Sequence, residues 1–189
     1  MSGVPRSGST VLAAILNQNK HTHVSTTSGV VFALDALANV WHSQGLLGEN
    51  DKERTKLSQT MGAVIDTFYE DVEEPVIIDK GRGWPIPTIL SAMTQVLGEK
   101  PKIVATVRSI PDCMASFVRV AKPDDLDEFI YSGILSTHLK ASYIAIQTGY
   151  EFAPECFCIV EYEDLVADPE AQLARIHEFL DLPDFDYDF

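Results

Sequence analysis

The chain has 189 residues, of which 46% are hydrophobic and 22% are charged, and it carries a net charge of −14. This length suits a single domain, 1–189, with a substantial core. The acidic balance argues against general binding to nucleic acids or acidic polysaccharides, because such binding depends on neutralising phosphate or sulfate groups. No apolar run approaches the roughly 20 residues of a membrane helix, so we expect a cytoplasmic protein with no membrane partner.

A segment rich in glycine and serine opens the chain. Residues 3–10 read Gly-Val-Pro-Arg-Ser-Gly-Ser-Thr, which has the P-loop spacing G-x-x-x-x-G-K-[ST] with Ser9 in place of lysine. Such a loop turns successive amide N–H groups toward an anion, and the apolar run 11–16 that follows predicts a helix whose amino terminus adds its dipole. The alternative is a Gly/Ser turn that merely caps a helix. Because so few residues precede the loop, we expect the first strand to be shortened.

The missing lysine separates this loop from those of kinases and NTPases. Those enzymes use the lysine to bridge the β- and γ-phosphates while Mg²⁺ is held by the Ser/Thr. Arg6 instead offers a planar guanidinium to a terminal anionic group. The segment therefore predicts an anion site that works without a metal ion.

Helical and strand patterns alternate through the rest of the chain. Helices are predicted within 29–71 (an amphipathic helix at about 53–71), at about 89–97, at about 125–149 and from 168 to 180, and strands at 76–79, 103–107 and 157–160. This alternation predicts an α/β fold, a P-loop-like three-layer α/β/α arrangement around a central parallel sheet. The three strands are followed by Lys80, Arg108 and Tyr162, which places these side chains at the ligand-binding edge of such a sheet.

Four segments, in the right order, resemble the sulfotransferases that use 3′-phosphoadenosine 5′-phosphosulfate (PAPS). Residues 5–10 resemble the family's 5′-phosphosulfate loop, in the P-R-S-G-[ST]-T branch of tyrosylprotein and bacterial enzymes. Residues 107–116 resemble its strand-end segment with an arginine and a following serine, and 79–84 its strand-end basic segment. Residues 161–183 resemble its Y-E-D-L…DP…F-L-x-L-P stretch.

The resemblance implies a role for each matching residue. Pro5, Arg6, Ser7, Gly8, Ser9 and Thr10 would bind the 5′ end of PAPS, Arg108 and Ser116 the 3′-phosphate, and Tyr162 would lie near the adenine. Arg6 and Lys80 would act on the transferring group, without a metal. Other interpretations stay open: Arg108 as a surface cation paired with Asp112, Tyr162 as a packing residue, and Lys80 with Arg82 as a solvated loop pair.

The general base is less apparent. In the tyrosylprotein branch a glutamate follows the loop, whereas the corresponding stretch here, 23–29, contains no carboxylate. This departure argues against a peptide-tyrosine acceptor and leaves His23 and Asp79 as the available proton acceptors, with His23 as our candidate base. An isolated histidine near a loop is, however, more often a surface or capping residue.

These observations predict transfer of a sulfuryl group from PAPS to a hydroxyl (or amine) of a small-molecule acceptor. The alternatives are a non-catalytic nucleotide- or anion-binding P-loop-like protein and, less favoured, a P-loop kinase. Phe32, Trp41 and Phe68 in the helical region 29–71 favour an apolar or aromatic acceptor. In the family, residues beyond the F-L-x-L-P helix cover the nucleotide. The short segment after Pro183 therefore predicts an exposed cofactor or a homo-oligomer in which a second subunit covers it.

Overall fold

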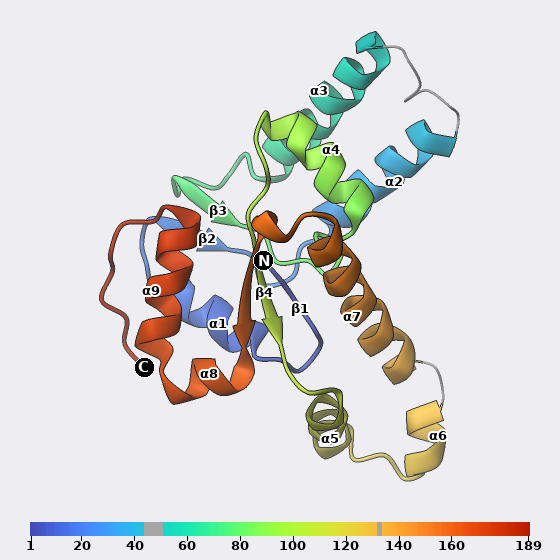
Figure 1. The fold of residues 1–189 in the computed structure, drawn as a ribbon, viewed down its shortest axis with the longest axis vertical. Helices are drawn as coiled ribbons and strands as arrows, with labels where there is room; N and C mark the ends of the chain where they lie inside the picture. The colour runs from blue at the N-terminus through green and yellow to red at the C-terminus, as the bar shows by residue number, and fades with distance from the viewer. Residues whose placement is uncertain (44–50, 132–133) are drawn as a thin grey trace.

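A parallel sheet forms the centre of the molecule, whose computed structural model describes residues 1–43, 51–131 and 134–189 (Figure 1). Strand β1 (Ser2–Gly3) pairs with β4 (Ile103–Val107), β4 pairs with β5 (Phe157–Glu161), and β2 (Thr22–Val24) pairs with β3 (Val76–Ile78). Met1 joins these two groups: its nitrogen donates to the Asp79 carbonyl at 2.6 Å, and the Gly81 N–H donates to the Met1 carbonyl at 3.1 Å. The strand order is therefore β2-β3-β1-β4-β5, and the predicted central parallel sheet is confirmed.

Helices cover both faces of this sheet. One face carries α1 (Ser9–Leu16), α8 (Tyr162–Ala167) and α9 (Pro169–Leu180), and the other carries α2 (Val30–Ser43), α3 (Asp51–Phe68), α4 (Pro87–Leu97), α5 (Ile110–Ala121) and α7 (Ile134–Phe152). Successive residues of β4 point to opposite faces, as strand geometry requires: Ile103 and Ala105 belong to one buried cluster and Val104 to the other. The predicted three-layer α/β/α arrangement is confirmed.

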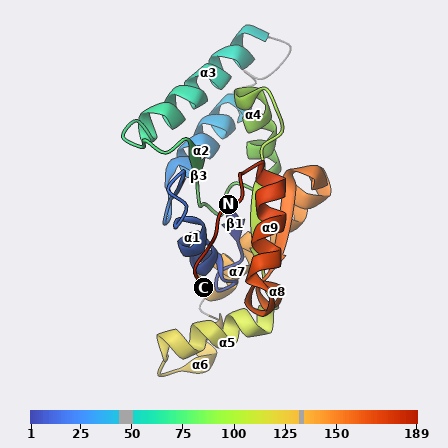
Figure 2. The ribbon, with the colours of Figure 1, turned by 90° about the vertical axis from the view of Figure 1, so that its left-hand side faces the viewer.

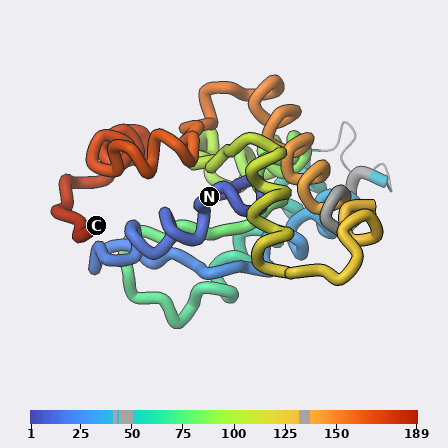
Figure 3. Tube along the Cα trace, turned by 90° about the horizontal axis from the view of Figure 1, so that it is seen from below, coloured from blue at the N-terminus to red at the C-terminus, as the bar shows by residue number. Residues whose placement is uncertain are grey.

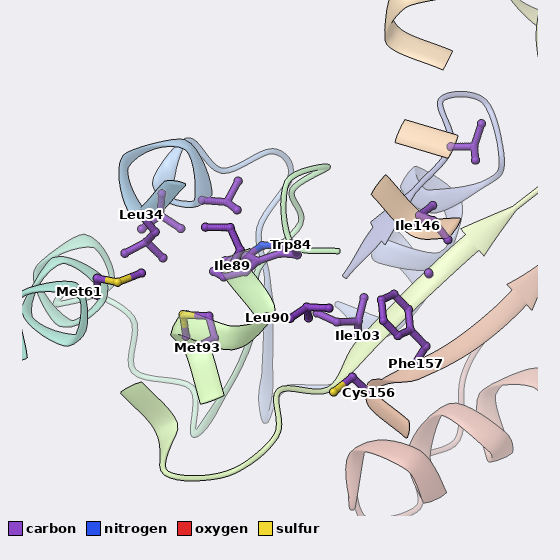
Figure 4. Packing of buried hydrophobic residues seen from close by; sticks show 14 of the residues in the cluster. Leu34, Met61, Trp84, Ile89, Leu90, Met93, Ile103, Ile146, Cys156 and Phe157 are labelled. Carbon is purple, nitrogen blue, oxygen red and sulfur yellow. The ribbon is translucent and has the colours of Figure 1, made fainter. Parts of the chain in front are cut away.

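The larger of the two buried clusters, which contains Ile103 and Ala105, connects helices α2, α3 and α4 to the sheet. Figure 4 shows Leu34 of α2, Met61 of α3 and Met93 of α4 grouped around Ile89, with Leu90 between this group and the sheet residues Ile103 and Phe157. Leu34 and Met61 are completely buried. Side chains of this size contribute about 1.5–3 kcal/mol each on full burial, so the α2–α4 layer is held mainly by apolar packing.

Short-range signals set the helix ends. Helix α4 begins at Pro87 and ends before Gly98, whose φ of 73° allows the left-handed cap. The Asp168 side chain caps α9 by accepting from the Ala171 N–H at 3.0 Å. These positions agree with the predicted start and stop signals for both helices.

Three features differ from the sequence-based expectations. Strand β2 was not predicted, because its three residues are only partly apolar. The helix predicted at about 125–149 is two helices, α6 (Leu126–Tyr131) and α7, while residues 132–133 lie outside the described part. A one-turn 3₁₀ helix, η1 (Pro154–Cys156), precedes β5. The first strand spans two residues, in agreement with the expected short strand.

The helices extend the molecule in two directions. Figure 2 shows α3 and α4 at one end of the long axis and α5 with α6 at the other. Figure 3 shows the C-terminal segment running back beside α1, where the Gln18 side chain donates to the Asp188 carbonyl at 2.8 Å. In the ranges that the structure covers, no helix combines the length and apolar character needed to cross a membrane.

Candidate functional site

The loop between β1 and α1 forms an open cradle of backbone donors. Arg6 and Gly8 have φ values of 71° and 88°, so the chain curls tightly before α1 begins at Ser9. The Leu12 N–H makes the first helical bond, to the Gly8 carbonyl at 2.9 Å, and no side chain caps the helix. The N–H groups of the first turn therefore face outward, and the helix dipole adds positive potential to them.

Ser7 anchors this loop to the sheet. Its side chain is completely buried, and its hydroxyl donates to the Thr106 carbonyl at 2.9 Å while accepting from the Thr106 hydroxyl at 2.6 Å. The Ser7 N–H donates to the Val4 carbonyl at 3.1 Å. Gly3 is pressed against the same strand, because a Cβ there would lie 2.2 Å from Thr106 Oγ1. Ser7 thus fixes the shape of the cradle, and its predicted direct contact with a cofactor stays a prediction.

Arg6 reaches from the loop to helix α5. Its Nε donates to Ser116 Oγ at 3.1 Å, and its guanidinium carbon lies 6.0 Å from the centre of the Phe117 ring. Among the described residues, this exposed guanidinium makes no other hydrogen bond, ion pair or ring contact. The structure therefore brings two of the predicted site residues together, and leaves most of the donors of Arg6 open to a ligand.

Arg108 and Tyr162 stack on each other beside the loop. The Arg108 guanidinium carbon stacks 4.1 Å from the centre of the Tyr162 ring, and its Nε lies 3.3 Å from a Glu163 carboxylate oxygen. A Cβ on Gly8 would lie 2.7 Å from the Tyr162 ring, so this ring lies directly against the cradle. The possible pairing of Arg108 with Asp112 is wrong, because Asp112 interacts with Ser109 at the start of α5.

Arg6 and Arg108 lie at the same edge of the sheet. Both guanidiniums are close to the buried thiol of Cys113 on α5. Burial raises the pKa of that thiol, and the positive charges of Arg108 and, more weakly, Arg6 act in the opposite direction. Arg6, which follows β1, and Arg108, which follows β4, thus lie beyond the same ends of two paired parallel strands.

Lys80 reaches across from the end of β3. Its Nζ lies 3.5 Å from Thr10 Oγ1 in the first turn of α1, and its backbone N–H donates to Ser25 Oγ at 2.7 Å. Burial lowers the pKa of Lys80, and the positive charge of Arg82 lowers it further. Lys80 is half-buried beside the loop, whereas Arg82 is exposed, so Lys80 is not simply a solvated partner of Arg82.

The loop, Arg6 and Lys80 border a cavity of about 450 Å³, whereas Arg108, Ser116 and Tyr162 are not among its lining residues. It is lined by Ser2, Gly3, Pro5, Arg6, Ser9, Thr10, Thr27, Ser28, Phe32, Lys80, Gly81, Arg82 and Phe117. Within the described part of the chain, the charged residues that line the cavity are all cations, and no carboxylate or imidazole is among them. In a chain with a net charge of −14, this local excess of positive charge is the electrostatic environment that an anion-binding site requires.

The two candidate bases do not line this cavity. His23 lies on β2 with its ring edge-on to Tyr69, at a centroid distance of 6.2 Å. The Asp79 carboxylate accepts hydrogen bonds from the Tyr69 hydroxyl and the Trp84 indole. Burial, together with the Asp79 hydrogen bond, raises the pKa of Tyr69 to about 12. The roles of His23 and Asp79 as bases stay predictions, and their positions give them no support.

Of the three aromatic residues predicted to shape the acceptor pocket, one is found among the residues that line the cavity. Phe32 lines the cavity, whereas Phe68 packs edge-on against Tyr69 at 4.9 Å and is not among its lining residues. The side chain of Trp41 lies outside the described part. Sequence reasoning missed Phe117, which also lines the cavity. Its position next to Ser116 in the motif was the available signal.

The comparisons with known proteins agree with this architecture. Residues 89–187, more than half of the chain, match the model of the Sulfotransferase family. The fold is similar to the sulfotransferase domain from the Synechococcus PCC 7002 olefin synthase, with a TM-score of 0.64 and 21% identity over 98% of this chain and 72% of that chain. It is also similar to the sulfotransferase domain from the curacin biosynthetic pathway, with a TM-score of 0.59 and 15% identity over 97% of this chain and 74% of that one. No curated protein sequence gives a significant match. The family match over more than half of the sequence shows that this chain belongs to the sulfotransferase family.

Proposed function

We propose that this protein transfers a sulfuryl group from PAPS to a hydroxyl (or amine) of a small-molecule acceptor. The observation that carries the proposal is the pair of arginines at one sheet edge: Arg6 in the cradle and Arg108 stacked on the tyrosine that borders it. PAPS carries anionic groups at both its 5′ and 3′ ends. Two separate cationic positions beside one cradle fit such a nucleotide.

The side chains present suit each anionic part of this donor. The open N–H groups at the start of α1 and the Arg6 guanidinium would hold the 5′ phosphosulfate. Lys80, which lies next to Thr10, would face the sulfonate. Arg108 would bind the 3′-phosphate with Ser116, and Tyr162 would lie near the adenine. This assignment divides the cations between the two ends of the nucleotide.

When bound, PAPS supplies an activated sulfuryl group, which passes to the acceptor oxygen or nitrogen as adenosine 3′,5′-bisphosphate leaves. The chain's own residues would position the reactants and stabilise negative charge. Arg6 and the loop amides would hold the charge that grows on the leaving phosphate, and Lys80 would neutralise the sulfonate oxygens. Phe32 and Phe117 would bound the acceptor side of the cavity. None of the described lining residues is a carboxylate or an imidazole, so the group that takes the acceptor proton is not among them.

One observation favours a second function. The absence of a carboxylate or imidazole among the described lining residues suits a protein that binds the nucleotide without catalysis. A P-loop kinase fits less well, because Ser9 occupies the position of the phosphate-bridging lysine. The three functions differ in which nucleotide binds and whether turnover follows.

The test combines calorimetry with turnover. We expect adenosine 3′,5′-bisphosphate to bind more tightly than ATP with Mg²⁺, and labelled PAPS to be turned over with a panel of hydroxyl and amine acceptors. Arg6→Ala should reduce turnover by about a hundredfold or more, because it removes a charge-assisted contact at the reacting group. Arg119→Ala, an exposed arginine in the last turn of α5, is the matched control and should behave as the parent protein.

Each other outcome has a definite meaning. Binding of ATP with Mg²⁺ but not of the bisphosphate would support the kinase. Tight binding of the bisphosphate without turnover of any acceptor would support the non-catalytic protein. Near-normal turnover by Arg6→Ala would remove Arg6 from the proposed mechanism.

A further inference from the structure

Arg82 is a cavity residue to which the proposed donor gives no role. It lies two residues beyond Lys80, is exposed, and lines the same cavity. Within the described part of the chain, no hydrogen bond or ion pair of its guanidinium is observed. Its charge is close enough to Lys80 to contribute to the lowered pKa of that lysine. Two cations thus line the same cavity, and none of its described lining residues is a carboxylate.

The backbone holds Arg82 in a fixed position. A Cβ on Gly81 would lie 2.8 Å from Val31 Cγ1, and one on Gly83 would lie 3.0 Å from Val31 Cγ2. The chain on both sides of Arg82 is therefore pressed against α2, where a larger residue would not fit. The Gly81 N–H also donates to the Met1 carbonyl at 3.1 Å, and the Ile86 N–H to the Gly83 carbonyl at 3.0 Å. An arginine presented from such an anchored segment loses little backbone freedom when it binds a ligand.

The charges at the 5′ end of the donor leave Arg82 in excess. The phosphate and the sulfate there carry one negative charge each, which Arg6 and Lys80 balance. Arg82 adds a third positive charge to the same cavity. A single guanidinium can pair with a singly charged, planar carboxylate, to which it donates two parallel hydrogen bonds.

We propose that Arg82 binds a carboxylate of the acceptor, so that the preferred substrates are small hydroxy (or amino) acids with an apolar or aromatic body. That body would lie against Phe32, which is 62% exposed, and Phe117, which both line the cavity. The inference rests on the proposed function, since it names the acceptor class of the same site. It adds a specificity-determining residue that is separate from the residues assigned to the donor.

The test uses a pair of acceptors that differ only in charge: 3-(4-hydroxyphenyl)propionate and its primary amide. We expect kcat/KM for the acid to exceed that for the amide by about ten- to a hundredfold, the range of a charge-assisted hydrogen-bonded pair. Arg82→Gln should reduce this acid-to-amide ratio toward one, and Arg82→Lys should retain part of it. The KM for PAPS should change little in Arg82→Gln. Arg119→Gln is the control, and should keep the full ratio.

Calorimetry provides a readout that does not depend on turnover. The acid should bind to the complex of the protein with adenosine 3′,5′-bisphosphate more tightly than the amide does, and Arg82→Gln should remove the difference. Equal binding of acid and amide to the parent protein, or an unchanged ratio in Arg82→Gln, would overturn the role of Arg82. Failure of the bisphosphate itself to bind would instead overturn the proposed function. The two failures are therefore distinguishable.

Discussion

Replacing Gly8 by alanine tests the contact between the cradle and Tyr162. Gly8 has a φ of 88°, and Gly98, at the end of α4, has a φ of 73°. Alanine at either position would have to adopt a left-handed conformation, which costs about 1–2 kcal/mol. The positions differ in their surroundings: nothing lies within 4 Å of a Cβ on Gly98, whereas a Cβ on Gly8 would lie 2.7 Å from the Tyr162 ring. Gly98→Ala is therefore the matched control.

The difference between the two variants isolates the effect of the ring. A contact of 2.7 Å forces the Tyr162 ring to move, and overpacking of this kind costs about 1–3 kcal/mol. We expect Gly8→Ala to unfold in urea with a free energy of unfolding lower by that amount than Gly98→Ala. The displaced ring would also carry Arg108 with it, since the two are stacked at 4.1 Å. Calorimetry should accordingly show bisphosphate binding at least about tenfold weaker in Gly8→Ala, a change of about 1.4 kcal/mol, and unchanged in Gly98→Ala.

Two results would refute this reasoning. Equal loss of stability in both variants would mean that the ring yields without cost. Unchanged bisphosphate affinity in Gly8→Ala would mean that the ring and the stacked arginine do not border the nucleotide site. A second substitution, Tyr162→Ala in the Gly8→Ala background, should recover the overpacking part of the lost stability but not the affinity.

Two further predictions concern residues that border the cradle. Because burial and Arg82 lower the pKa of Lys80, its charge should be lost at a pH below the usual lysine value of 10.5. The kcat/KM for PAPS should therefore fall as the pH rises through that lowered pKa, and Lys80→Arg, whose guanidinium stays charged, should shift the fall to higher pH or abolish it. The lowered pKa means that the charged form of Lys80 is disfavoured in the folded protein. Its unfavourable contribution to stability should therefore be present at neutral pH and diminish as the pH rises through the lowered pKa toward 10.5. Urea unfolding at a series of pH values tests this, and the same pH dependence in Lys80→Gln and the parent protein would contradict it. Ser7→Ala should lower the free energy of unfolding by about 1–3 kcal/mol and weaken bisphosphate binding, because the buried Thr106 oxygens lose their partner. The control Ser58→Ala, whose exposed hydroxyl bonds to the Gln95 carbonyl, should change stability by less than about 0.5 kcal/mol, and similar losses in the two variants would argue against the anchoring role of Ser7.

The sheet, and the edge at which the polar residues follow its strands, were predictable because they depend on local patterns. The apolar runs at 76–78, 103–107 and 157–161 are strands, and the polar residues after them lie near the cradle. Strand β2 was not predicted, because Thr22-His23-Val24 is too short and too polar to show an alternation of apolar and polar residues. A strand of this kind forms because a neighbouring strand supplies its hydrogen bonds, which the local sequence does not reveal.

Partners distant in the sequence could not be predicted. The bond between Arg6 and Ser116 joins residues that are 110 positions apart, and the family motif alone assigned them to different ends of the nucleotide. The sequence suggested Asp112 as an ion-pair partner of Arg108. In the structure Arg108 pairs with Glu163, because Asp112 is already engaged with Ser109 at the start of α5. Such choices depend on which side chains tertiary packing has already used.

The narrow join in the middle of the sheet has a consequence for how ligands affect the molecule. Met1 and the two-residue strand β1 lie between β3 and β4, so few backbone bonds link the β2-β3 half to the β4-β5 half. Lys80 extends from one half, whereas Arg108 extends from the other. A nucleotide held by cations from both halves would act as a crosslink between them. Binding would then stiffen the whole sheet as well as fill the cavity, and slower amide exchange in β3 and β4 would report it.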